Sequence, residues 1–281
     1  MRDLNKGLMH FHFPFTAVQA LWTLTFAAQL VLLTVLLGRE RARRYPWFTA
    51  SIAVNALSLL SEELLTGRMA KIPLQAIAGA LAEIEAIVGL LVVLELTRLA
   101  FAGTSRRTWI VWTLALAALV GGALVALGPW PATWKDLAWD SVLGRLRLMQ
   151  FLAQKTDLIA SLFAVELGLL AALFGSGFKA GWKSHTQRIA IGLGSFAAAS
   201  LGAQLAVQHI ARTAQFHSRA EYERLVGRVN NLFSASEAVY VAVLVWWIAC
   251  LWIDEPGAAP AYEAAPDSAE APLPDAEQTS E

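Results

Sequence analysis

The chain has 281 residues, of which 57% are hydrophobic and only 16% are charged, and its formal net charge is zero. Soluble domains usually carry about 25% charged residues, so this composition indicates a membrane protein, and the neutral charge argues against nucleic-acid binding. The single cysteine, Cys250, excludes an internal disulfide and a multi-cysteine zinc site.

Apolar stretches along the chain predict an all-α protein, a polytopic bundle of seven membrane-spanning helices. A hydrocarbon core about 30 Å thick requires about 20 apolar residues in a helix, and helices satisfy their own backbone in lipid. The first stretch follows Arg2 and Lys6 but is too long for a cleavable signal. Asn55, Glu62 and Glu63 interrupt the second stretch, and six spans would remain without it. The predicted spans are residues 15–37, 47–65, 73–99, 109–128, 151–175, 189–210 and 232–252.

Basic residues in the short loops predict the orientation. Total basic residues are nearly balanced between the two sides, but Arg39, Arg41, Arg43 and Arg44 are concentrated directly after the first span. This density predicts an N-terminus outside and a C-terminus in the cytoplasm. The expected location is the bacterial plasma membrane, as a multi-pass protein surrounded by the lipid bilayer.

The regions outside the spans differ from one another in composition. Residues 129–149 and 212–229 mix aromatic and aliphatic with charged side chains, and we expect them to lie at the membrane surface as interfacial helices. Residues 254–281 are rich in Pro, Ala and acidic residues and contain no Lys or Arg. Such a segment buries too little apolar area to fold. We therefore predict a transmembrane domain over 1–253 and a disordered cytoplasmic tail over 254–281.

Polar side chains recur at helical spacing within several predicted spans. Residues separated by three or four positions share one face of a helix. Intramembrane ionisable groups are costly and usually face the bundle interior or water. The polar rows are Thr16, Gln19 and Thr23; Ser51, Asn55, Ser58 and Glu62; Gln150, Gln154, Asp157 and Ser161; Ser200, Gln204 and Gln208; and Asn230, Ser234, Glu237 and Tyr240.

These rows predict a polar pocket in the outer half of the bundle. The acids Glu83, Glu85, Asp157 and Glu237 outnumber the nearby bases, which favours a small polar or cationic ligand. The alternative is that the same groups only form interhelical hydrogen bonds. The candidate ligand-binding residues are Glu83, Gln154, Asp157, Gln204, Gln208, Ser234 and Glu237.

A second candidate feature lies at the cytoplasmic end of the third span. Glu95 and Arg98 are three residues apart, which is the spacing of an ion pair within one helix. The functional alternative is a switch, in which Arg98 is released when the helices rearrange.

The sequence lacks the residues that several well-known classes of membrane protein require. The last span has no lysine for a retinal Schiff base, and only His209 is close to a span, which argues against haem or zinc. The stretch Gly192–Ser195 has no partner histidine at suitable depth, so its small residues indicate close helix packing instead of a nucleophile. We therefore predict a non-enzymatic protein with no cofactor and no metal site.

Several stretches resemble a family of uncharacterised bacterial seven-helix integral membrane proteins. They are Arg44–Phe48, Ala56–Leu60, Leu94–Phe101, Ile189–Phe196 and Trp246–Ile248. The resemblance covers most of residues 15–253. It implies the number of helices and carries no activity or site residues.

Three functions follow from these observations as hypotheses. The first is a receptor-like or sensory module with an outward-facing pocket, because no enzyme domain is attached. The second is a proton-coupled small-molecule transporter, although the inner halves of the spans from Leu162 to Phe174 and from Val241 to Leu251 offer little polarity beyond Glu166. The third is a membrane scaffold subunit. A homo-oligomer or a membrane partner stays an open alternative for each.

Overall fold

A computed structural model describes residues 17–100, 115, 119–123, 142–174, 184–214 and 218–254 of the chain. No strand occurs among these residues. Six of the helices are long and apolar enough to cross a membrane. The elements are α1 (Ala17–Gly38), the short 3₁₀ helix η1 (Arg41–Arg43), α2 (Pro46–Leu65), α3 (Lys71–Ala100), α5 (Val142–Phe174), α6 (His185–Thr213) and α7 (Arg219–Trp252).

These six helices correspond to six of the seven predicted spans. The remaining span, 109–128, lies mostly outside the described residues, as does the predicted tail beyond Asp254. Helices α5 and α7 begin well before their apolar stretches, so residues 142–149 and 219–229 continue these helices instead of forming separate interfacial ones. The hydroxyl of Ser218 caps α7 by accepting a hydrogen bond from the backbone N–H of Glu221 at 3.2 Å.

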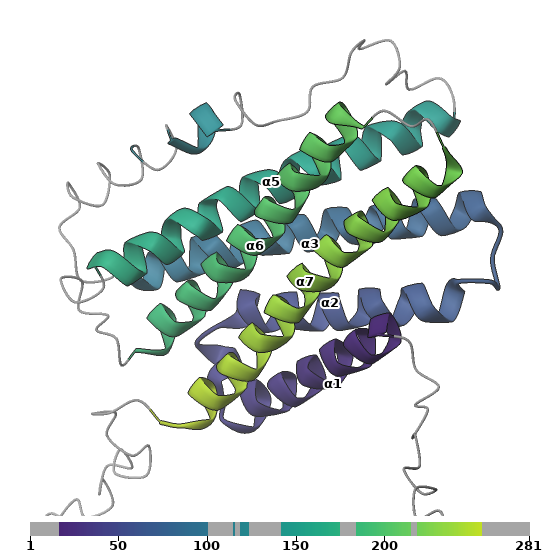
Figure 1. Cartoon of the computed structure of the whole chain (residues 1–281). Coiled ribbons are helices and arrows are strands. Elements are labelled where there is room, and N and C mark those ends of the chain that lie inside the picture. Colours follow the sequence, from purple (N-terminus) through teal and green to yellow (C-terminus); the bar gives the residue numbers. More distant parts are fainter. Residues whose placement is uncertain are drawn as a thin grey trace, which may run out of the picture.

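The six helices form a ring in which each packs against the next (Figure 1). The order is α1, α2, α3, α5, α6 and α7, and α7 closes the ring against α1. Helices α3 and α5 run in the same direction, because Gly79 lies opposite Met149, Glu83 bonds to Thr156, and Gly89 lies opposite Ala160 further along both helices. The other neighbours in chain order, such as α2 and α3, run antiparallel (Figure 1).

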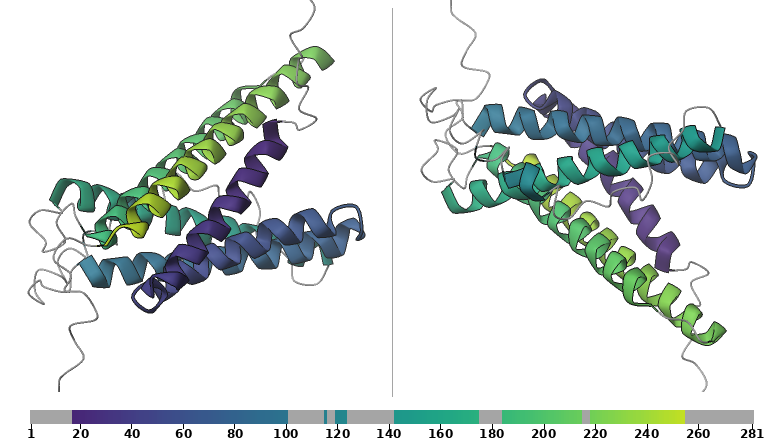
Figure 2. Two further views of the ribbon diagram at one scale, coloured as in Figure 1. Left: turned by 90° about the horizontal axis from the view of Figure 1, so that it is seen from below. Right: turned by 90° about the horizontal axis from the view of Figure 1, so that it is seen from above.

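The two ends of the ring are packed differently. We call one the arginine end, because it holds η1, and the other the cavity end, where α2 ends and α7 begins. Figure 2 shows α6 and α7 close to α2 and α3 at the arginine end and leaning away from them toward the cavity end. The ring is therefore closed at one end and wider at the other.

A dense hydrophobic core fills the arginine end. Leu36, Leu96, Leu244 and Trp247 are at most 1% exposed and come from three helices, α1, α3 and α7. The ring of Phe48 packs edge-on against Trp247 with centroids 4.9 Å apart, a favoured aromatic geometry. Burial of this apolar surface holds α1, α2, α3 and α7 together.

Glycines on α5 and α6 allow two helices to meet backbone to backbone. A methyl group built on Gly194 would lie 2.8 Å from the Cα atom of Gly168, and one built on Gly192 would lie 2.4 Å from the indole nitrogen of Trp247. No side chain fits at either position without movement of its neighbours. The prediction that Gly192–Ser195 serves close helix packing is confirmed.

Glu95 holds the first turn of α2 from the neighbouring helix α3. Its carboxylate accepts hydrogen bonds from the backbone N–H groups of Trp47 at 3.2 Å and Phe48 at 3.0 Å. These first-turn donors have no partner within their own helix, and a negative charge is favoured there. The predicted ion pair between Glu95 and Arg98 is absent from the described contacts, and Arg98 is exposed. The sequence analysis considered only Arg98 as a partner of Glu95 and did not foresee backbone donors from a neighbouring helix.

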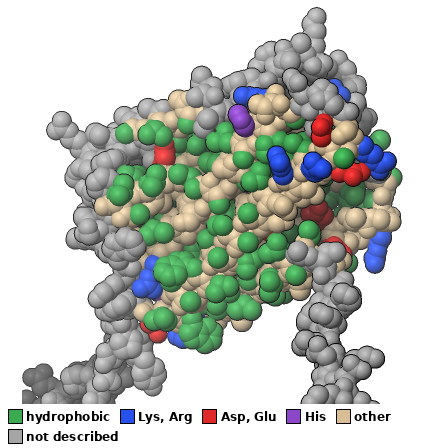
Figure 3. Space-filling model, viewed as in Figure 1, with side chains coloured by type: hydrophobic (Ala, Val, Ile, Leu, Met, Phe, Trp, Pro, Cys, Tyr) green, Lys and Arg blue, Asp and Glu red, His purple; other side chains and the backbone are tan. Residues whose placement is uncertain are grey.

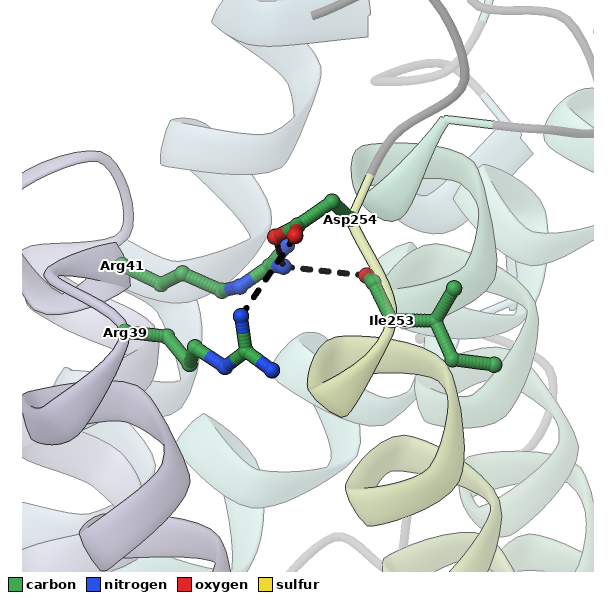
Figure 4. A network of polar contacts seen from close by, with 4 residues as sticks. All are labelled: Arg39, Arg41, Ile253 and Asp254. Carbon is green, nitrogen blue, oxygen red and sulfur yellow. Dashed lines mark hydrogen bonds and ion pairs between the residues drawn. The ribbon is translucent and has the colours of Figure 1, made fainter. Parts of the chain in front are cut away.

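A polar network joins the end of α7 to the turn after α1 (Figure 4). The carboxylate of Asp254 lies 3.1 Å from Arg41 and 3.4 Å from Arg39. Arg41 also donates a hydrogen bond to the carbonyl oxygen of Ile253 at 2.9 Å. Two helices that are far apart in the sequence are thus tied together at the arginine end.

The face of the molecule seen in Figure 3 is apolar in its middle. Figure 3 shows hydrophobic side chains across the middle of the visible face, with most of its charged groups gathered toward the two ends. Exposed apolar residues of the long helices include Leu24, Val31, Leu57 and Trp246. This distribution fits the six apolar helices and is the arrangement expected for a protein surrounded by lipid.

A candidate ligand-binding cavity

All six long apolar helices contribute to a cavity of about 560 Å³ inside the ring. It extends from Ala82 to Val93 along α3, which is about 16 Å of helix. The lining residues recur at three- and four-residue spacing, such as Ala82, Glu85, Ala86 and Gly89 on α3. One face of each helix therefore turns toward the cavity. The volume falls in the range of small-molecule sites.

Four carboxylates line the half of the cavity nearer to the cavity end. Glu62 comes from α2, Glu85 from α3, Asp157 from α5 and Glu237 from α7. Glu85 is half-buried and the other three are exposed, so the cavity is open at this level. None of the described residues that line it is a lysine, an arginine or a histidine. We call this space the carboxylate cavity; its acidic side chains favour a bound cation or protons.

Uncharged polar groups lie deeper, where α1, α2 and α7 meet. The hydroxyl of Tyr240 accepts hydrogen bonds from the side-chain amides of Gln29 at 3.1 Å and Asn55 at 3.5 Å. Tyr240 and Gln29 are 8% and 1% exposed. Because these bonds link three helices at the base of the cavity, a ligand that reaches this depth would contact all three.

The opposite wall of the deeper part is apolar. Val92, Val93, Ala164, Phe196 and Ala197 line it from α3, α5 and α6. The ring of Phe196 lies 4.5 Å from that of Tyr240, measured between centroids. Beyond this level the packed core of the arginine end begins, with Leu244 0% exposed. The cavity is thus closed toward the arginine end.

The structure places the seven predicted ligand-binding residues in three different settings. Gln154, Asp157 and Glu237 line the cavity. Glu83 and Gln204 are outside the lining but bond to residues of α5: Thr156 donates a hydrogen bond to Glu83 at 3.4 Å, and Gln204 donates one to Asp157 at 3.4 Å. Gln208 and Ser234 are absent from its lining.

Glu85, not Glu83, is the acid of α3 that faces the cavity. Two positions turn an α-helix by about 200°, so the two carboxylates point in nearly opposite directions. Glu85 shares its face with Ala82, Ala86 and Gly89, which also line the cavity. Small residues at this spacing flank Glu83 as well, in Gly79 and Ala86, so the sequence alone did not separate the two acids.

Helix α1 contributes polar residues that the sequence analysis overlooked. Thr25 and Gln29 are buried and line the cavity. The predicted row on this helix was different: Thr23 is exposed and donates its hydroxyl to the backbone carbonyl of Gln19. The i, i+4 spacing of Thr25 and Gln29 was a signal that could have identified them. Ser51, Asn55, Ser58, Glu62, Ser161 and Tyr240, noted only as members of polar rows, also line the cavity.

The carboxylates do not gather around a single point. In the described part of the chain, no group of three or more histidine, cysteine, aspartate or glutamate residues could hold a metal ion. Comparisons with protein-family models, with curated proteins and with solved structures give no match. The residues of the cavity are therefore the basis for a functional proposal.

Proposed function

We propose that this chain is a receptor-like or sensory membrane module that binds a small polar or cationic ligand in the carboxylate cavity. The observation that carries the proposal is the set of four carboxylates, contributed by four helices, in a cavity whose described lining has no basic side chain. Such a site repels anions, and a cation would offset the repulsion between the acids.

The proposal includes seven membrane crossings with the N-terminus outside. Helices α3 and α5 are parallel neighbours, so the chain between Ala100 and Val142 has to return across the membrane before α5 begins. A helix over 109–128 would supply that crossing. The arginines around η1 favour the cytoplasm for the arginine end. The carboxylate cavity would then open to the outside of the cell.

Helices α1 and α7 offer a route from the cavity to the cytoplasmic side. Gln29 and Tyr240 connect them at the base of the cavity, and Arg39, Arg41 and Asp254 connect them at the arginine end. A ligand that shifts Tyr240 would move α7 relative to α1 and change the contacts of Asp254. In this scheme the readout lies in the Asp254 network, and Glu95 keeps its place as the cap of α2 instead of a latch with Arg98.

A proton-coupled transporter is the second candidate, since the same carboxylates could carry protons. The packed core below the cavity disfavours it. Leu36, Leu96 and Leu244 in this core are 0% exposed. On α2, Ser51 is the polar residue of the described cavity lining that lies nearest to the arginine end. Transport would require this core to open.

Binding of cations to the purified full chain tests the proposal. A panel of primary amines and quaternary ammonium ions is titrated in calorimetry, with matched carboxylic acids as negative controls. We expect a cation to bind, and Glu85→Gln, Asp157→Asn and Glu237→Gln each to weaken it by at least about tenfold, the value of a charge-assisted hydrogen bond.

The matched control for these variants is Glu63→Gln. Glu63 is the neighbour of Glu62 on α2 but lies outside the cavity lining, so the change should leave affinity intact. The proposal would be abandoned if no cation in the panel bound, or if the three cavity variants left both affinity and thermal stability unchanged.

A further inference from the structure

The distribution of charge along the carboxylate cavity restricts its ligand further. On each of α2, α3, α5 and α7 the carboxylate lies toward the cavity end. Uncharged lining residues of the same helices, namely Asn55, Val92, Ala164 and Tyr240, lie further toward the arginine end. The acidic half and the uncharged half are therefore separated along the axis of the bundle. A ligand with charge at both ends would place one charge among uncharged groups, which is costly.

The uncharged half contains an acceptor that needs a donor. The side-chain carbonyl oxygen of Gln29 has no hydrogen-bond partner within the part of the chain that the structure describes, although Gln29 is only 1% exposed and lines the cavity. An unsatisfied buried acceptor costs about 1–3 kcal/mol. Tyr240 does not relieve it, because its hydroxyl contacts the amide nitrogen of this side chain and not the carbonyl oxygen.

Between the acidic half and Gln29 the cavity wall is lined by small apolar residues. Ala86, Gly89 and Ala160 from α3 and α5 leave room for an apolar segment. The lined stretch of about 16 Å of helix fits an extended molecule better than a compact ion.

We infer that the ligand is an elongated organic amine with one cationic end, an apolar middle and a hydrogen-bond donor, such as a hydroxyl, at its uncharged end. Its ammonium group binds among Glu62, Glu85, Asp157 and Glu237, and its donor reaches the carbonyl oxygen of Gln29. This inference rests on the proposed function and adds the chemical class of the ligand.

A series of eight-carbon probes of equal length tests the inference. Aminooctanol, octylamine, diaminooctane and octanediol are titrated against the full chain in lipid nanodiscs by calorimetry, and the heats of empty nanodiscs are subtracted. We expect aminooctanol to bind about tenfold more tightly than octylamine, because only its hydroxyl satisfies Gln29. Diaminooctane should bind less tightly than aminooctanol, and octanediol should not bind.

Gln29→Met removes the acceptor while keeping the length of the side chain. In this variant the affinities of aminooctanol and octylamine should become equal, with that of octylamine unchanged. If the variant fails to fold, the probe series on the native chain still decides. Equal affinities of aminooctanol and octylamine there, or tightest binding of diaminooctane, would overturn the ligand class and leave cation binding intact. Absence of binding by every amine would overturn the proposed function as well.

Discussion

The arginine end and the cavity end are built from the same six helices but differ in how their inward faces are filled. At the arginine end, the faces carry large apolar residues such as Leu96, Leu244 and Trp247, and all are buried. At the cavity end, the faces carry alanine, serine and carboxylates, and they enclose open space. Side-chain size and polarity along one helix face thus decide whether a bundle closes or leaves a site.

The division also assigns different tasks to the two ends. Close packing at the arginine end fixes the relative positions of the helices, because interiors of this density tolerate little change in volume. The cavity end is then free to carry polar groups that contribute little to folding and are available to a ligand. Substitutions should therefore affect stability at one end and binding at the other.

The largest effect is expected where α5 and α6 touch. Gly194→Ala places a methyl group 2.8 Å from the Cα of Gly168 and 2.9 Å from the carbonyl oxygen of Ala164, both of them backbone atoms. We expect a loss of about 1–3 kcal/mol in stability, the usual cost of overpacking. Thermal unfolding of the purified chain in detergent measures it.

Gly202 on the same helix α6 is the matched control for this prediction. A methyl group there meets nothing within 4 Å. Gly202→Ala should be neutral or raise stability by up to about 1 kcal/mol, because alanine favours the helix. Equal destabilisation by the two variants would contradict the conclusion that the helices are packed more closely at the arginine end than toward the cavity end.

An intermediate effect is expected at the cap of α2. Glu95→Ala removes the acceptor for the backbone N–H groups of Trp47 and Phe48, and we expect a loss of about 1–2 kcal/mol. Glu95→Gln retains one acceptor oxygen and should cost less. Arg98→Ala should have almost no effect on thermal unfolding; a loss as large as that of Glu95→Ala would instead favour the ion pair.

The smallest effect is expected in the surface network of Figure 4. Asp254 is exposed, with 75% of its side chain accessible, so its ion pairs with Arg39 and Arg41 are screened by solvent. Asp254→Asn should lower stability by less than about 1 kcal/mol. The difference should vanish at high salt, where charges are screened further. A loss that persists in high salt would mean that the network supports the fold directly.

Much of the helical framework could be predicted from the sequence, because the length of an apolar run is a local property. For six spans, most of the predicted ends lie within a few residues of the observed helix ends. The beginnings of α5 and α7 were missed, because residues 142–149 and 219–229 are helical but too polar to count as part of a membrane-spanning stretch. A helix can continue beyond the membrane at no cost in buried polar groups, and composition does not mark that boundary.

The candidate site was harder to predict, because it depends on which face of each helix turns inward. Asp157 and Glu237 follow from helical spacing, but Glu83 and Glu85 cannot be separated without knowing the neighbours of α3. The role of Glu95 depends on the start of α2, which lies almost 50 residues earlier in the chain. Partners of this kind are fixed by the order of helices in the ring and not by local pattern.

Accessibility of an engineered thiol tests most directly whether the cavity is a wet space reached from outside the cell. With Cys250 replaced by alanine, Ser58→Cys places a thiol in the cavity lining, and Leu57→Cys places one on the exposed apolar surface next to it. A membrane-impermeant cationic thiol reagent is then added to intact cells. We expect modification at Ser58→Cys, faster than with an anionic reagent of similar size, and none at Leu57→Cys. No modification at Ser58→Cys, or equal modification of the two positions, would contradict it.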